Sequence, residues 1–184
     1  MRIIAPSKAI DFEATDIYGN TVKLHEFKER AIVLSFFRDA SCPLCLKRVF
    51  ELRARRKQWK SKGIEIIAVF NSSEEQIKKY SEDTSTRFTA IADPDLVISE
   101  LYGVEKSSDS FFKTLRVNML NIFSGAKADN DVTKNTNGTI IPADFLIDHD
   151  GAIVDLWYGS HETDHMPMNR IDGFVQTMLK KIKP

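Results

Sequence analysis

The chain has 184 residues, 42% of them hydrophobic and 28% charged, and its formal net charge is zero. This balance excludes an intrinsically disordered chain and gives no reason to expect nucleic acid as a partner. No apolar run approaches the length of a membrane span, and the first eight residues lack the apolar core of a signal peptide. We therefore expect a single domain over residues 1–184 with no membrane partner. It would be a cytoplasmic protein or a mature form that has already been trimmed.

The first predicted element is a β-hairpin. Residues 10–16 and 21–24 both alternate apolar and polar side chains, and Tyr18-Gly19-Asn20 between them is a turn signal. Residues 25–27 are predicted to form a short helical turn that leads into the next strand.

The chain's two cysteines lie where a predicted strand gives way to a predicted helix. The apolar run of residues 31–37 predicts a buried strand, and apolar residues at helical spacing extend over residues 46–62, with Gly63 as the ending signal. Cys42 and Cys45 stand at the switch. A thiol at a helix N-terminus faces backbone N–H groups and the positive end of the helix dipole, and both favour the thiolate. The Cys-x-x-Cys spacing is too close for a disulfide framework, and it indicates redox chemistry.

The middle of the chain alternates strands with helices. Residues 64–70 and 88–92 are predicted strands. A capping box that pairs Ser73 with Gln76 opens a helix between them, and residues 96–102 form the next predicted helix. This alternation predicts βαβ units and a sheet that is at least partly parallel.

Residues 105–138 interrupt the alternation with a predicted helical insert, followed by a polar loop over residues 127–138. Six apolar side chains fall on one helical stripe: Phe111, Phe112, Leu115, Met119, Ile122 and Phe123. The stripe belongs either to the core, as in most amphipathic helices, or to a surface for a homodimer or another partner.

The C-terminal part combines a hairpin with a helix. Residues 139–148 and 152–158 are predicted strands around the turn signal Asp150-Gly151. Residues 170–182 carry apolar side chains at helical spacing and predict a closing amphipathic helix.

The order of these elements, together with three short motifs, resembles the AhpC/TSA-type (peroxiredoxin-like) redoxin family of the thioredoxin superfamily over nearly the whole chain. The motifs are Asp11-Phe12 with Asp16, Gly19 and Leu24, then residues 92–95 with 101–104, and then residues 142–148 with Asp150-Gly151. The resemblance implies an α/β thioredoxin-like fold. In such a fold a peroxiredoxin-type N-terminal hairpin precedes a central mixed sheet that is flanked by helices.

The active-site residues depart from the peroxiredoxin pattern. Aligned on Cys45, that family's proline and threonine fall at Arg38 and Cys42. Aligned on Phe145, the family's peroxide-binding arginine falls at Pro142. Thioredoxins are more similar here, because the Cys-Pro-Leu-Cys sequence corresponds to their redox pair and Pro142 to their cis-proline. This likeness implies a cis Ile141–Pro142 bond, a minority state that the fold would have to support.

The likeness to thioredoxin implies a thiol–disulfide oxidoreductase whose Cys42 and Cys45 cycle between dithiol and disulfide. Cys42 would attack a protein or small-molecule disulfide, and Cys45 would resolve the mixed disulfide. Pro142 would shape the substrate groove. Arg38 and Asp39 either tune the thiolate in opposite directions or are exposed loop charges. We expect a thioredoxin- or glutathione-type reductant, no cofactor or metal, and an antioxidant role in cell redox homeostasis.

Three alternatives remain open. In the first, a peroxiredoxin-type thiol peroxidase reduces hydrogen or alkyl peroxides through a sulfenic acid at Cys45 or Cys42. The helix N–H groups and Arg38 would then stabilise the transition state. In the second, both cysteines join His161 and His165 in a Cys₂His₂ zinc site, although we expect these histidines on the surface. In the third, the chain is a non-enzymatic binding protein that uses the apolar stripe.

Overall fold

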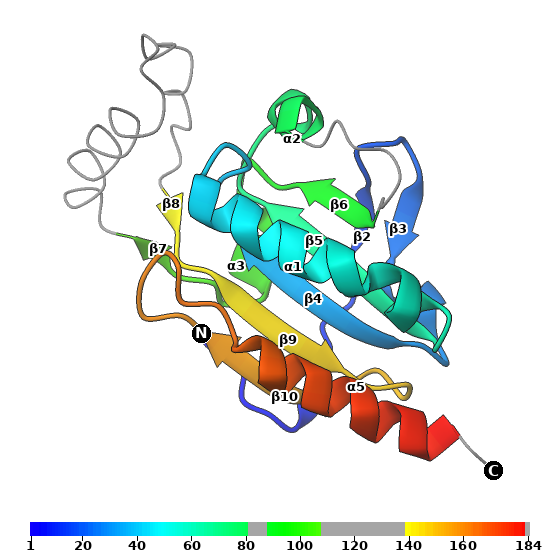
Figure 1. The fold of residues 1–184 in the computed structure, drawn as a ribbon. Coiled ribbons are helices and arrows are strands. Elements are labelled where there is room, and N and C mark those ends of the chain that lie inside the picture. The colour runs from blue at the N-terminus through cyan, green and yellow to red at the C-terminus, as the bar shows by residue number, and fades with distance from the viewer. Residues whose placement is uncertain (81–87, 108–138, 183–184) are drawn as a thin grey trace, which may run out of the picture.

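The computed structural model describes residues 1–80, 88–107 and 139–182, and a six-stranded sheet lies at its centre (Figure 1). In spatial order the strands are β1 (Ser7–Lys8), β10 (Ala152–Tyr158), β9 (Ala143–Ile147), β4 (Ala31–Phe37), β5 (Ile64–Phe70) and β6 (Thr89–Ala92). Strands β4, β5 and β6 run parallel, whereas β9 is antiparallel to β4 and β10 is antiparallel to β9. The sheet is therefore mixed, as predicted.

Two small ladders accompany this sheet. Strands β2 (Glu13–Thr15) and β3 (Thr21–Lys23) form the predicted N-terminal hairpin, and the short helix η1 (Leu24–Phe27) follows it. Strands β7 (Lys106–Ser107) and β8 (Thr139–Ile140) pair antiparallel. The predicted helical stripe between Phe111 and Phe123 and the predicted loop over residues 127–138 lie outside the described residues, so they stay predictions.

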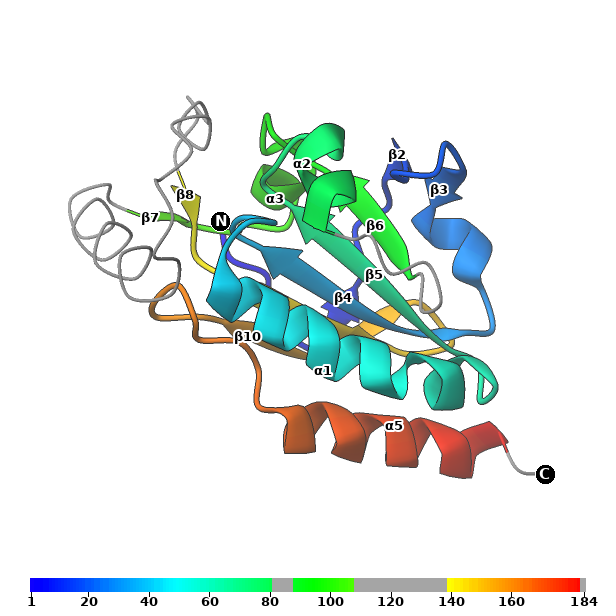
Figure 2. The same ribbon diagram turned by 45° about the horizontal axis from the view of Figure 1, so that its top comes forward.

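Helices and the N-terminal segment cover opposite faces of the sheet. Helices α1 (Pro43–Lys60) and α5 (Met168–Ile182) lie side by side on one face (Figures 1 and 2), where α2 (Glu74–Tyr80) also contributes Ile77 to the core. Helix α3 (Val97–Leu101) and the N-terminal segment pack on the other face. Side chains alternate along β4, so Val33 and Phe37 face α1, whereas Leu34 and Phe36 face α3. This alternation also turns Ser35 toward the α1 face.

Local sequence signals explain several of the boundaries. Gly63 follows α1 with a φ of 74°, a left-handed conformation that suits glycine. The capping box is present, because the Ser73 N–H donates to Gln76 Oε1 at 3.1 Å and the Gln76 N–H donates to Ser73 Oγ at 3.3 Å. Helix α3 starts one residue later than predicted, since Leu96 itself has a φ of 61°. Strand β1 was not predicted, because two polar residues carry no periodic signal.

Candidate active site

The two cysteines flank the start of α1. Strand β4 ends at Phe37, and residues 38–42, which we call the cysteine loop, lead to Pro43, the first residue of α1. Cys42 is the N-cap residue, with extended backbone angles, and Cys45 lies one turn inside the helix. Both are free thiols that are 8% and 2% exposed, respectively. The sequence prediction of a thiol pair at a helix N-terminus is therefore correct in its geometry.

The two thiols differ sharply in their affinity for a proton. A hydrogen bond from the Cys45 thiol is the largest influence on Cys42, and it lowers the pKa of that thiol. Burial opposes it, but the guanidinium of Arg38 and backbone N–H groups add to it, so the pKa of Cys42 is lowered to about 5. The same hydrogen bond, burial and the charge on Cys42 raise the pKa of Cys45 well above its ordinary value. Cys42 is therefore the thiolate at neutral pH, and Cys45 holds the proton.

The two charged residues of the cysteine loop play different parts. Arg38 donates from Nη2 to Sγ of Cys42 at 3.0 Å, so its positive charge lies against the thiolate. The carboxylate of Asp39 instead accepts hydrogen bonds from the backbone N–H and the hydroxyl of Ser41, both at 2.8 Å. The structure therefore places Arg38 in direct contact with the candidate nucleophile, whereas Asp39 closes the loop.

Pro142 directly precedes β9, close to the end of β4, the strand that leads into the cysteine loop. Ala143 pairs with Phe36 of β4, and Pro142 comes directly before this register. The expected cis bond at Ile141–Pro142 is wrong: among the described residues, the cis peptide bond is Ala5–Pro6. The trans form is the lower-energy state of the bond. The polar groups on either side of it are paired, because the Ile141 N–H and the Pro142 carbonyl both have backbone hydrogen-bond partners at 2.9 Å.

A buried polar cluster, defined here as Ser35, Arg48, Asp144 and His165, joins β4, α1, β9 and the segment before α5. Asp144 is fully buried on β9, where Ser35 of β4 is its register partner and donates a hydrogen bond to Oδ1 at 2.6 Å. Oδ2 accepts the backbone N–H of Met166 at 2.8 Å and lies 3.2 Å from Nδ1 of His165. Burial alone would raise the pKa of Asp144, but His165, Arg48 and the Ser35 hydroxyl outweigh it and lower that pKa. Asp144 is therefore a buried carboxylate.

Sequence reasoning missed this cluster and misplaced one of its members. His165 was expected on the surface, but its side chain is only 7% exposed because the segment before α5 folds back onto β9. The one available signal was Asp144, an acidic residue inside an otherwise apolar predicted strand.

The alternative of a zinc site is not supported by the geometry. His161 is exposed and its Nδ1 lies 3.2 Å from the Thr163 hydroxyl, whereas Nδ1 of His165 contacts Asp144. No cluster of three or more candidate ligands occurs among the residues that the structure describes. The two histidines and two cysteines therefore do not form the Cys₂His₂ set.

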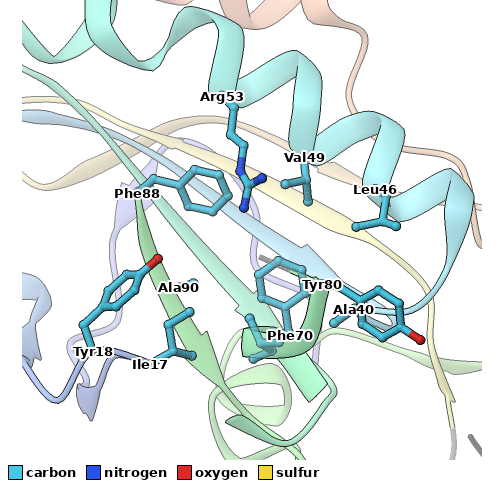
Figure 3. Close-up of a pocket in the computed structure, with 11 residues that line it drawn as sticks. Ile17, Tyr18, Ala40, Leu46, Val49, Arg53, Phe70, Tyr80, Phe88 and Ala90 are labelled. Carbon is cyan, nitrogen blue, oxygen red and sulfur yellow. The ribbon is translucent and has the colours of Figure 1, made fainter. Parts of the chain in front are cut away.

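A pocket that is open to solvent runs along α1, on the side that faces α2 and β6 (Figure 3). Its walls are largely apolar: Ile17, Tyr18, Ala40, Leu46, Val49, Phe70, Ile77, Tyr80, Phe88 and Ala90. Arg53 is the charged member, and its guanidinium lies 5.8 Å from the centre of the Phe88 ring. Ala40 and Leu46 bring one end of the pocket close to the cysteine loop, but neither thiol lines it. The pocket is therefore not the redox centre itself.

None of the helices in the described part of the chain combines the length and the apolar composition that a membrane span requires.

Comparisons with known proteins agree with this geometry. The model of the AhpC/TSA family matches residues 6–156. Peroxiredoxin Bcp of Bacillus subtilis is 26% identical over 166 residues, which cover 90% of this chain and 92% of Bcp. Thiol-disulfide oxidoreductase ResA of Halalkalibacterium halodurans is 26% identical over 101 residues, which cover 54% of this chain and 57% of ResA.

The fold comparison leads to the same group. The crystal structure of peroxidoxin BcpB from Mycobacterium tuberculosis superposes with a TM-score of 0.68 at 16% sequence identity, and the match covers 97% of each chain. This likeness shows a thioredoxin-like fold, which is the fold that the sequence predicts.

Proposed function

Because the chain belongs to the AhpC/TSA family, we propose that it is a thiol–disulfide oxidoreductase in which Cys42 and Cys45 cycle between dithiol and disulfide. The observation that carries the proposal is the asymmetry of the two thiols: Cys42 has a pKa of about 5 beside Arg38, and Cys45 keeps its proton. A nucleophile that is ionised at neutral pH next to a protonated second thiol is the arrangement that disulfide exchange needs.

The reaction balances without a cofactor. The Cys42 thiolate attacks one sulfur of a substrate disulfide, and the other substrate sulfur leaves as a thiolate. Cys45 then loses its proton and attacks Cys42, which releases the second substrate thiol and leaves the Cys42–Cys45 disulfide. The two electrons that the substrate gains come from the two cysteines, and a thioredoxin- or glutathione-type reductant would restore the dithiol.

The remaining candidate residues act on the Cys42 thiolate or on the substrate. Arg38 stabilises the thiolate through its charge. Asp39 holds the loop through Ser41, so the N–H groups at the start of α1 stay directed at Cys42. Pro142 has no N–H, and it would shape the groove in which a substrate backbone lies beside the sulfurs.

Reduction of hydrogen or alkyl peroxides is the second candidate function, and the named peroxiredoxin relatives favour it. Here Cys42 would attack the O–O bond, become a sulfenic acid and release water or an alcohol. Cys45 would then condense with the sulfenic acid, releasing water and forming the same disulfide. The low pKa of Cys42 supports that residue, rather than Cys45, as the site of sulfenic acid formation.

We further propose an antioxidant role in the cytoplasm, where such reductants keep thiols reduced. A homodimer through the predicted stripe of residues 111–123 is part of the same proposal.

One experiment decides between the two reactions. Reduced protein is mixed with oxidised glutathione in one series and with hydrogen peroxide or cumene hydroperoxide in another, and the loss of both thiols is followed by alkylation and mass spectrometry. Rapid loss with the disulfide and slow loss with both peroxides is the expected result. The reverse order would favour the peroxidase, and thiols that stay reduced in both series would refute both functions.

A further inference from the structure

His165 has a ring nitrogen whose hydrogen-bonding capacity is unused. Its Nδ1 faces the Asp144 carboxylate at 3.2 Å, and its Nε2 is buried without a hydrogen-bond partner among the described residues. A carboxylate beside Nδ1 favours the tautomer with the proton on that nitrogen, so the lone pair of a neutral ring is on Nε2. A buried acceptor without a partner is costly, which points to a use for it.

The cluster to which His165 belongs lies on the face of α1 that carries Cys45. Arg48 follows Cys45 by three residues, so the two side chains are on one face of the helix, and both are buried. Nη2 of Arg48 donates to the carbonyl of Met166, the neighbour of His165, at 2.6 Å. The imidazole itself packs against Phe37, the last residue before the cysteine loop, with ring centroids 4.9 Å apart.

Cys45 needs a proton acceptor when the mixed disulfide is resolved. Its thiol is 2% exposed, so bulk water has little access to it. Its pKa is raised by the Cys42 thiol, by burial and by the charge on Cys42. Once Cys42 is bound in a mixed disulfide, its thiolate charge is gone, but Cys45 stays buried and still needs a group that takes up its proton.

Resting on the proposed function, we infer that His165, held by Asp144, is the proton acceptor for Cys45 during resolution. Because Nε2 has no hydrogen-bond partner among the described residues of the resting protein, its contact with Cys45 forms only in the mixed disulfide. There the proton passes from Sγ of Cys45 to Nε2 of His165, and the thiolate electron pair forms the bond to Sγ of Cys42. The bond between Cys42 and the substrate sulfur breaks, and that sulfur leaves with the electron pair. His165 then returns the proton to the leaving thiolate or to solvent, and Asp144 acts as a positioning residue.

The charges that face the imidazole suit this role. Asp144 on β9 supplies the negative charge that stabilises a protonated ring. Arg48 on α1 supplies a positive charge, which lies 4.0 Å from the same carboxylate and 3.5 Å from Glu51. Arg38 in the cysteine loop favours both thiolates. The positive charge on protonated His165 is thus balanced by Asp144. The negative charge of the Cys45 thiolate is balanced by Arg38.

An aromatic disulfide, 5,5′-dithiobis(2-nitrobenzoate), separates the two half-reactions in a stopped-flow experiment. Attack by Cys42 releases a first coloured thiolate, and attack by Cys45 on the resulting mixed disulfide releases a second. For His165→Gln we expect the second phase to slow by about tenfold to a hundredfold near neutral pH and to recover as the pH rises. The first phase should change less than about twofold. His161→Gln, an exposed histidine of the same segment, is the matched control and should leave both phases unchanged.

The two ideas fail in different ways. A second phase with the wild-type rate and pH profile in folded His165→Gln overturns the proton acceptor. Loss of the first phase in wild-type protein, or its survival in Cys42→Ser, overturns the proposed function instead.

If His165→Gln does not fold, His165→Asn is the second variant, because its amide is likewise a neutral group that cannot take up the proton. The same slow second phase and the same recovery with rising pH are expected. A folded His165→Asn protein with the wild-type second phase would also overturn the inference.

Discussion

Nη2 of Arg38 donates a hydrogen bond to Sγ of Cys42 at 3.0 Å, between the first and the last of the five residues that separate strand β4 from helix α1. A cation fixed at this distance stabilises the thiolate but leaves the neutral thiol almost unaffected, so it lowers the pKa. The contact is local, because both partners belong to the same loop. It therefore gives a variant that tests the nucleophile without altering the sheet.

Arg38→Gln should raise the pKa of Cys42 by about one unit, because one of the charges that favour its thiolate is removed. The shift should be smaller than that of Cys45→Ala, since the Cys45 thiol is the largest influence on Cys42. The pH dependence of alkylation by iodoacetamide measures both. Arg55→Gln removes a different arginine, paired with Asp172, and serves as the control. Equal pKa values in Arg38→Gln and wild-type protein would contradict the assignment.

Cys45→Ser should accumulate a mixed disulfide at Cys42, because the attacking thiol is intact and the resolving thiol is missing. Cys42→Ser should form no mixed disulfide. Intact-mass spectrometry after incubation with oxidised glutathione distinguishes them.

A sulfenic-acid probe applied to Cys42→Ser after a peroxide pulse supplies the complementary test. Because the pKa of Cys45 is raised, we expect little labelling. Rapid stoichiometric labelling at Cys45 would instead identify a peroxidase that uses this cysteine as its nucleophile.

Asp144→Asn should lower the free energy of unfolding by about 1–3 kcal/mol, because a buried carboxylate with several donors is replaced by a neutral amide. Burial opposes the ionisation of Asp144, but His165, Arg48 and Ser35 hold its folded pKa below the ordinary value of 3.8. The unfolded chain therefore takes up the proton first as the pH falls. The stability from this carboxylate is complete well above pH 3.8 and is lost as the pH falls through the lowered folded pKa.

Denaturant titrations of wild-type protein and Asp144→Asn between neutral and acid pH check this prediction. The stability difference should shrink as the pH falls. Asp172→Asn, on the partly exposed partner of Arg55, should behave almost like wild-type protein. A difference that stays constant at all pH values would mean that the charge of Asp144 contributes nothing.

Gly159→Ala should destabilise the protein by about 1–3 kcal/mol, because its Cβ has no room. That atom would lie 2.5 Å from the carbonyl oxygen of Asp164 and 3.0 Å from that of Pro142, both of which are backbone atoms. Gly173→Ala is the control within α5, where an added Cβ meets nothing within 4 Å. It should stabilise the helix by about 0.5–1 kcal/mol. Thermal unfolding of both variants checks the pair, and equal melting temperatures would contradict the crowding at residue 159.

Polar replacement of Phe112 and Phe123 tests the predicted apolar stripe. If the stripe is an oligomer surface, light scattering should report a smaller mass with an unchanged melting temperature. An unchanged mass with a collapsed melting temperature would assign the stripe to the core.

The sequence was most informative where burial is complete. The predicted strands over residues 31–37 and 64–70 match β4 and β5 to the residue, because a strand buried on both faces is a continuous apolar run. Cys42 and Cys45 were found for a similar reason, since their position depends only on where a strand ends and a helix begins. Such local signals in the sequence predict most of the strands and helices.

The rest depends on contacts between distant segments. His165 approaches Asp144 because the chain between β10 and α5 turns back over the sheet, and no periodicity in the sequence reports that turn. The backbone around the Ile141–Pro142 bond is likewise held by distant residues, because the Ile141 N–H donates to the Glu105 carbonyl and the Pro142 carbonyl accepts the Gly159 N–H. Side chains and bonds determined by such tertiary contacts were beyond prediction from a single sequence.

The short ladder of β7 and β8 makes the junction between Ser107 and Thr139 a site at which one segment can be replaced by another. Ser107 and Thr139 are register partners, so the two ends of the segment between them are already neighbours in the ladder. A loop of any length can be grafted between two anchors that are already neighbours, since the entropy of closing it grows only with the logarithm of its length. If the stripe of residues 111–123 is a surface rather than part of the core, chimaeras with a tight turn, a peptide epitope or a reporter domain at this junction should therefore keep the sheet and the cysteine loop.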